Sequence, residues 1–166
     1  MFAKTFGCCR KVYNLMLSDK IEGYKATGKF PTVTPAKYKD EYPYLREVDS
    51  LALANKQMDL QGALRNRFNK SRKKNNGFPK YKSAKHSRKA YTTNNQKGTV
   101  AITDNKYIRL PKIGKVKAVI HRIPDDGWII KSATVSQESD GKYYISVLFE
   151  FDNAVNNYVA DKNNAV

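Results

Sequence analysis

The sequence predicts an α+β protein in which a helical segment is followed by a small antiparallel β-barrel or sandwich. Apolar residues of the first half recur at the three- and four-residue spacing of helices. From Gly98 onward, short apolar runs alternate with polar residues and are separated by turn signals such as Asp140-Gly141. A hydrophobic content of 40%, with seven Phe and eleven Tyr, is enough for a folded core.

The first long helix is predicted over residues 3–26. Apolar side chains between Phe2 and Tyr24 share one face, and Gly28 is a typical helix stop. The pair Thr34-Pro35 then indicates the start of a short helix that closes before Pro43, because proline is favoured at the first helical position.

A second long helix is predicted over residues 50–74, after Asp49. One face consists of apolar positions, and polar or basic residues occupy the others. The apolar positions are Leu53, Leu60, Leu64 and Phe68. The Asn75-Asn76-Gly77 run is expected to end this helix.

The remaining chain is predicted to be β-structure over residues 98–151. Asp140-Gly141 is expected to form a type I′ hairpin turn. We expect a helical segment at residues 1–76, a basic connector and barrel at 77–152, and a linker at 153–166. In the connector, Phe78 is expected to plug into the barrel.

The charge distribution indicates a polyanionic partner. The formal net charge is +16, and no Asp or Glu occurs between Asp59 and Asp104. Such a long acid-free basic stretch favours nucleic acid over an anionic membrane surface. Lys and Arg would neutralise phosphates, and two Tyr would stack on unpaired bases. The candidate RNA- or phosphate-binding residues are Arg65, Lys70, Arg72, Lys73, Lys74, Lys80, Tyr81, Lys82, Lys85, Arg88, Lys89 and Tyr91.

Neither an enzyme site nor a membrane segment is expected. The histidines are isolated, and no nucleophile constellation or phosphate-binding glycine loop is present. Four acids lie at predicted turns, namely Asp104, Asp125, Asp126 and Asp140, so a carboxylate metal site is not expected. Cys8 and Cys9 are adjacent, which suits neither a zinc site nor a mutual disulfide. Without a signal sequence or an apolar membrane-spanning run, a cytoplasmic protein is expected.

Five stretches carry a resemblance to a known family. In order they are FGCCRKVYN, EYPYLREVDS, GFPKYKS, IRLPKIGKVK and IIKSATVSQESDGKYYISVLFE. The chain resembles the N-terminal half of TnpB (also called OrfB), an accessory protein of bacterial insertion sequences that is similar to compact type V CRISPR effectors. The resemblance implies a helix-turn-helix-like recognition segment and an OB-like barrel, the wedge domain. It also implies that the full-length family acts as a Mg²⁺-dependent RNA-guided DNA endonuclease.

The resemblance also implies which parts of the family are missing. Family members usually begin with a strand before the FGCCR motif, so we expect one open barrel edge in a chain that starts at Met1. The chain ends at Val166, ahead of the family's RuvC-like nuclease domain, so residues 153–166 would lead toward an absent domain. Mg²⁺ and Zn²⁺ are therefore expected only in the absent C-terminal half, and this chain is expected to be a non-catalytic, truncated or split half.

The same resemblance implies partners. In the family this region holds the guide RNA, and the short motif beside the target is contacted by the start of the second long helix and by a Thr-Asn-Asn segment. The matching positions here are Ser50, Leu51, Ala54, Asn55, Thr93, Asn94 and Asn95. From residue type alone, Ser50 is equally well explained as a helix N-cap, and residues 93–95 as a polar turn.

Three functions remain open from the sequence. The first is the half of an RNA-guided nuclease that binds guide RNA and target double-stranded DNA, with a C-terminal nuclease half or a second copy as a further partner. The second is an autonomous DNA-binding regulator derived from TnpB, and the third is a general basic RNA-binding protein. All three would act in the bacterial or archaeal cytoplasm, close to the nucleoid.

Overall fold

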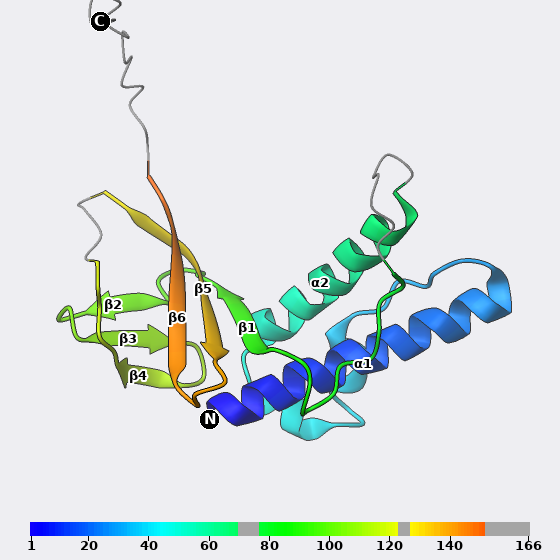
Figure 1. The fold of residues 1–166 in the computed structure, drawn as a ribbon, viewed down its shortest axis with the longest axis horizontal. Coiled ribbons are helices and arrows are strands. Elements are labelled where there is room, and N and C mark those ends of the chain that lie inside the picture. The colour runs from blue at the N-terminus through cyan, green and yellow to red at the C-terminus, as the bar shows by residue number, and fades with distance from the viewer. Residues whose placement is uncertain (70–76, 123–126, 152–166) are drawn as a thin grey trace, which may run out of the picture.

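The computed structural model describes residues 1–69, 77–122 and 127–151, and Figure 1 shows a helical part beside two small sheets. The helical part begins with α1 (Phe2–Thr27) and ends with α2 (Ser50–Phe68). Two 3₁₀ helices connect them, η1 (Pro35–Tyr38) and η2 (Pro43–Glu47). The α+β order predicted from the sequence is confirmed.

Helix α1 follows the prediction to within one residue at each end. Gly28 has φ 71°, and its N–H bonds the carbonyl oxygen of Tyr24 at 2.8 Å. This is the left-handed helix cap that a glycine adopts without steric cost. The predicted helix stop at Gly28 is therefore confirmed.

The other helical predictions are confirmed less closely. The short helix expected after Thr34-Pro35 is a single 3₁₀ turn, η1, and η2 after Pro43 was not predicted. Helix α2 starts at Ser50 as predicted but ends at Phe68, where Asn69 adopts an extended ψ of 105°. The predicted helix end near residues 75–77 falls largely outside the described residues, which resume at Gly77.

The described strands form two antiparallel three-stranded sheets. One has the order β1-β5-β6 and the other the order β2-β3-β4, and the strands of the two sheets cross steeply in Figure 1. Strand β1 differs from the prediction, which places its residues in the basic connector. The strands are β1 (Lys89–Asn94), β2 (Ala101–Thr103), β3 (Tyr107–Leu110), β4 (Gly114–Lys117), β5 (Ile129–Gln137) and β6 (Tyr143–Glu150).

The two sheets are not closed into a barrel in the part of the chain that the structure describes. An apolar groove opens between them, with Ile108 and Val116 on one side and Ile145 and Phe149 on the other. His121 lines the same groove and lies outside the strands. The predicted β-architecture is thus correct in class, and closure is the detail that differs.

Two tight turns show where left-handed backbone is used. Asp104 and Asn105 have φ values of 54° and 48° between β2 and β3, which is the pattern of a type I′ turn. In the β5–β6 hairpin, Gly141 has φ 82°, while Asp140 is not among the described residues with positive φ. The hairpin at Asp140-Gly141 is confirmed, but its predicted type I′ conformation is wrong.

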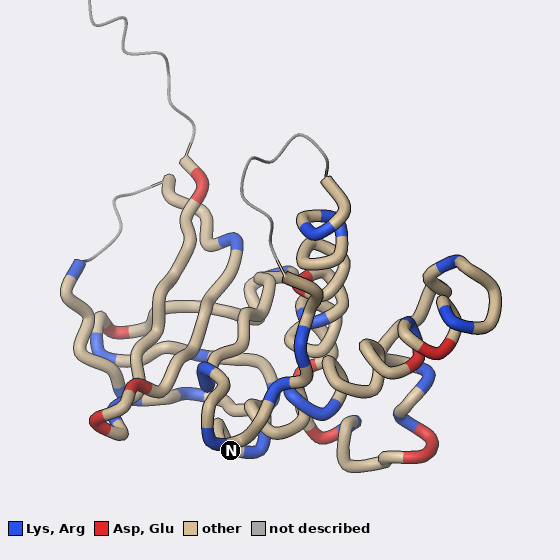
Figure 2. Tube along the Cα trace, turned by 45° about the vertical axis from the view of Figure 1, so that its right-hand side comes forward, with Lys and Arg blue, Asp and Glu red and all other residues tan. Residues whose placement is uncertain are grey.

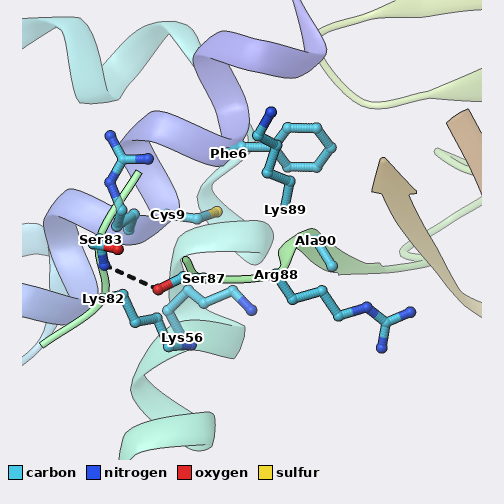
Figure 3. Close-up of a pocket in the computed structure, with 10 residues that line it drawn as sticks. Phe6, Cys9, Lys56, Lys82, Ser83, Ser87, Arg88, Lys89 and Ala90 are labelled. Atoms are coloured by element: carbon cyan, nitrogen blue, oxygen red, sulfur yellow. Dashed lines mark hydrogen bonds between the residues drawn. The ribbon is translucent and has the colours of Figure 1, made fainter. Parts of the chain in front are cut away.

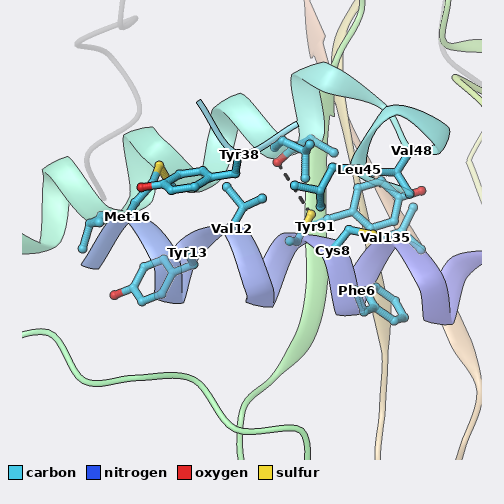
Figure 4. Packing of buried hydrophobic residues seen from close by; sticks show 14 of the residues in the cluster. Phe6, Cys8, Val12, Tyr13, Met16, Tyr38, Leu45, Val48, Tyr91 and Val135 are labelled. Carbon is cyan, nitrogen blue, oxygen red and sulfur yellow. Dashed lines mark hydrogen bonds between the residues drawn. The ribbon is translucent and has the colours of Figure 1, made fainter. Parts of the chain in front are cut away.

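One hydrophobic core joins the helices to the first sheet (Figure 4). Val12 and Met16 of α1 are fully buried, as is Leu53 of α2. Tyr91 of β1 enters the same core, with its ring centroid 5.8 Å from that of Phe6. The core therefore crosses the predicted division at residue 76, and the separate domain boundaries remain a prediction.

Candidate nucleic-acid interface

The segment that connects α2 to β1 carries most of the predicted cations that the structure describes. Lys80, Lys85 and Arg88 are exposed there, as is Lys89 at the start of β1, and Tyr81 is 57% exposed. Figure 2 shows Lys and Arg along this segment and on both helices. Arg65 is also exposed, on α2. The predicted residues Lys70, Arg72, Lys73 and Lys74 lie outside the described residues.

Asn14 of α1 fixes the connecting segment at its middle. Its side-chain oxygen accepts a hydrogen bond from the backbone N–H of Lys82 at 2.8 Å, and its amide nitrogen donates to the Lys82 carbonyl oxygen at 2.9 Å. The ammonium group of Lys82 lies 4.1 Å from the centre of the Tyr13 ring. The segment thus runs over α1 in a defined conformation, with its exposed cations on the outer side.

Tyr91 does not belong to this exposed surface. It is 2% exposed, and its hydroxyl has no hydrogen-bond partner in the described structure. Burial raises the pKa of the phenol well above its ordinary value, with smaller contributions from Cys9 and Asp49. The predicted base-stacking role of Tyr91 therefore conflicts with its place in the core, because a stacking ring must reach solvent.

Phe78 also differs from its predicted place. Instead of filling a barrel, its ring stacks on Phe30 with centroids 6.5 Å apart, and Phe30 in turn contacts Phe68 of α2. Phe78 retains 37% exposure. It therefore anchors the connecting segment to the helical part and not to the sheets.

The start of α2 is capped by Asp49. The Asp49 carboxylate accepts hydrogen bonds from the backbone N–H groups of Leu51 and Ala52, each at 3.2 Å. Ser50 is the first residue of the helix, and its hydroxyl accepts a hydrogen bond from Lys39 at 3.0 Å. The explanation of Ser50 as the N-cap is therefore wrong, and its side chain remains on the exposed surface.

The structure brings the two predicted DNA-reading clusters together. The amide nitrogen of Asn55 donates to the Thr92 carbonyl oxygen at 2.9 Å and lies 3.5 Å from the side-chain oxygen of Asn94. Asn94 is exposed at the end of β1, while Leu51 and Ala54 are partly buried on the first turns of α2. The start of α2 and the end of β1 therefore form one continuous surface.

Two residues of the Thr-Asn-Asn segment have structural partners instead. Thr93 is fully buried, and its hydroxyl donates to the Asp49 carboxylate. Asn95 donates to the Ile130 carbonyl oxygen and accepts from the Val100 N–H, both at 2.9 Å. Of the three, Asn94 alone has the exposure that contact with a base edge requires.

The acids and cysteines show no arrangement for metal chemistry in the described ranges. No group of three or more His, Cys, Asp or Glu side chains is close enough there to hold a metal ion. Asp104 and Asp140 lie at turns as predicted, and Asp125 and Asp126 fall outside the described residues. Cys8 and Cys9 are buried free thiols, and burial raises the pKa of Cys9 to about 12.

No helix within the described ranges has the length and apolar character that crossing a bilayer requires.

Two comparisons with known proteins bear on this interface. A family model described as a helix-turn-helix domain, that of the OrfB proteins of insertion sequences, matches residues 1–29. A protein of Streptomyces pristinaespiralis named as an RNA-guided DNA endonuclease is 29% identical over 167 aligned positions, which cover 89% of this chain. The chain is a TnpB/OrfB relative. It spans 37% of the length of the Streptomyces protein.

The family match falls on a single helix of the structure. Residues 1–29 coincide with α1 and its glycine cap, and the next long helix begins only at Ser50. The helix-turn-helix motif joins its two helices by a turn of about three to four residues. In this TnpB/OrfB relative, residues 28–49 and two 3₁₀ helices fill that place, so α1 and α2 pack together with a much longer connection.

Proposed function

We propose that this chain is the nucleic-acid-binding part of a TnpB-like RNA-guided DNA endonuclease, where it holds guide RNA and contacts the DNA beside the target. One observation carries the proposal: the start of α2 and Asn94 of β1 meet at one exposed surface. The acid-free connecting segment leads directly into β1, so the proposed phosphate-binding and base-contacting side chains follow one another along the chain. The printed name of the Streptomyces relative supports RNA and DNA as the partners.

Within this proposal the two groups of side chains have different tasks. Exposed Lys and Arg of the connecting segment bind phosphates, which gives affinity without sequence preference. Tyr81 is the exposed ring on which an unpaired base stacks. Asn94 and the neighbouring Ser50 contact base edges, since Asn side chains pair with adenine in the major groove. The phosphate contacts therefore position the protein, and the polar surface reads the motif.

In this proposal the chain binds nucleic acid but does not cleave it. Phosphodiester hydrolysis of the two-metal kind requires several carboxylates that converge on Mg²⁺. We place these groups, and a zinc site, in a separate nuclease half. That half or a second copy of the chain is the expected further partner. With guide RNA and Mg²⁺ present, the purified chain is expected to leave plasmid DNA intact, and guide-dependent nicking would contradict this division of roles.

A matched pair of double variants tests the phosphate-binding surface. Lys80→Ala/Lys85→Ala removes two exposed cations of the connecting segment, and Lys25→Ala/Lys29→Ala removes two at the far end of α1. The first is expected to weaken binding to a structured RNA and to lower the slope of log K against log salt by about 0.7 to 0.9 per lost phosphate contact. Equal effects of both pairs would show that only net charge matters, as expected for a general basic RNA-binding protein.

A DNA-binding regulator is the second candidate, because α1 matches a helix-turn-helix model. RNA dependence separates the two functions. We expect motif-selective binding to double-stranded DNA only when guide RNA is present. Equal selectivity without RNA, measured by fluorescence anisotropy with a scrambled duplex as the control, would favour the regulator.

A further inference from the structure

A shallow pocket lies where the connecting segment crosses both long helices (Figure 3). Its polar walls come from α1, α2, the segment and the start of β1, namely Arg10, Lys56, Lys82, Ser83, Ser87, Arg88 and Lys89. The cavity volume is about 20 Å³. A single water needs about 10–15 Å³, so the enclosed space is too small for a base and holds about one oxygen atom of an anion bound at the pocket mouth.

The pocket carries an excess of positive charge. Lys56 is paired with Asp59 at 2.7 Å and Arg88 lies 3.8 Å from Glu138, but Arg10, Lys82 and Lys89 have no carboxylate within ion-pair distance among the described residues. Lys82 is half-buried, and its ammonium group contacts the Tyr13 ring instead of a carboxylate. Unpaired, partly buried cations are costly, and a bound anion would remove that cost.

Two hydroxyl groups are also free to donate into the pocket. The Ser87 oxygen accepts a hydrogen bond from the Ser83 N–H at 2.9 Å, and the Ser83 oxygen accepts one from the His86 N–H at 3.0 Å. A serine hydroxyl that accepts one bond still has its own hydrogen to donate. No acceptor for either hydrogen occurs among the described residues, so both serines have unused donors beside the cations.

We propose that this pocket binds one phosphate group, with Arg10 and Lys82 as its charged ligands and the Ser83 and Ser87 hydroxyls as its neutral donors. The source we name is the backbone of a nucleic acid that follows the connecting segment, and this part rests on the proposed function. Burial lowers the pKa of Lys82 and the nearby charge of Lys56 lowers it further, while Asp59 offsets only part of this shift. A bound phosphate supplies the missing opposite charge at that point.

Inorganic phosphate is the probe for the pocket itself. In ¹H–¹⁵N spectra of the full chain, phosphate is expected to shift the amide signals of residues 83–89. Lys82→Gln and Arg10→Gln, which change different elements, should each weaken the phosphate response about tenfold, as expected for loss of a charge-assisted hydrogen bond. Lys25→Gln removes one exposed charge near the far end of α1 and does not line the pocket, so its response should match the wild type. Equal responses of all variants would overturn the proposal.

Salt-dependent binding then identifies the source of the phosphate. Lys82→Gln should lower the slope of log K against log salt by about 0.7 if single-stranded RNA occupies the pocket, or by about 0.9 if duplex DNA does. Lys25→Gln is the charge-matched control. A slope that Lys82→Gln leaves unchanged for RNA and for DNA would refute a nucleic-acid source. If the wild type binds neither nucleic acid, the proposed function fails, while the phosphate titration still decides whether the pocket exists. Melting temperatures confirm that each variant is folded.

Discussion

Asp49 is expected to be the residue that joins the helical part to the sheet most strongly. Its carboxylate accepts three hydrogen bonds, two from the first turn of α2 and one from the buried Thr93 hydroxyl of β1. Asp49 itself is only 9% exposed. The substitution Asp49→Ala removes all three acceptors at once and leaves the other side chains unchanged.

The size of the loss follows from these contacts. Replacing an N-cap Asp by Ala costs about 0.5–2 kcal/mol. A buried hydroxyl that loses its partner costs about 1–3 kcal/mol, and Thr93 has no exposure through which water can replace the carboxylate. We therefore expect Asp49→Ala to lower the free energy of unfolding by roughly 3 kcal/mol, a large share of the about 5–15 kcal/mol of a typical domain.

Urea unfolding followed by circular dichroism measures this loss. Ser50→Ala is the matched control, because Ser50 is exposed and does not cap the helix, and its cost should stay within about 0.5 kcal/mol. Thr93→Val should cost less in the Asp49→Ala background than in the wild type, since the hydroxyl is then already unpaired. Equal costs for Asp49→Ala and Ser50→Ala would refute the capping role, and equal costs of Thr93→Val in both backgrounds would refute the coupling.

Three further outcomes are expected. Asn94→Ala should leave stability unchanged but lower DNA binding in a motif-dependent way. Asn95→Ala should instead lower the free energy of unfolding by about 1–3 kcal/mol, because it removes the hydrogen bonds to Ile130 and Val100. Urea unfolding of both variants measures the difference. Tyr91→Phe should be neutral or stabilising in thermal melts, because it removes a buried hydroxyl that has no partner; a loss above about 1 kcal/mol would contradict this. Burial raises the pKa of Cys9 to about 12 from the ordinary thiol value of 9.0, so this thiol ionises first in the unfolded chain. The free energy of unfolding should therefore fall as pH rises from 9 to 12. Cys9→Ala should show a smaller fall.

The parts of the fold that depend on local sequence were predictable. The end of α1 at Gly28 requires a residue that tolerates positive φ, and a glycine at this position in the sequence indicates it. The strands from β2 onward follow alternating patterns between turn residues. Strand β1 was missed because its two inward residues, Tyr91 and Thr93, lie among polar and basic neighbours that resemble an extended basic connector.

The candidate site depends on contacts that no spacing reveals. Asn55 and Asn94 are far apart in the chain, and α2 must pack on β1 before they meet. The resemblance named both clusters, but only the packing shows that Thr93 and Asn95 face inward. Arg10 is absent from the predicted set for the same reason. It lies on α1, far in sequence from the connecting segment, and only the packing places it in the same pocket.

The two hydrogen bonds between Asn14 and the backbone of Lys82 have a consequence for affinity. A flexible basic tail loses conformational entropy when it folds onto a polyanion, and this loss weakens binding. Here the Asn14 side chain bonds both the N–H and the carbonyl oxygen of Lys82, as a neighbouring β-strand would. The backbone that carries these cations is therefore ordered at Lys82 before any ligand arrives, so binding has to order mainly the exposed side chains.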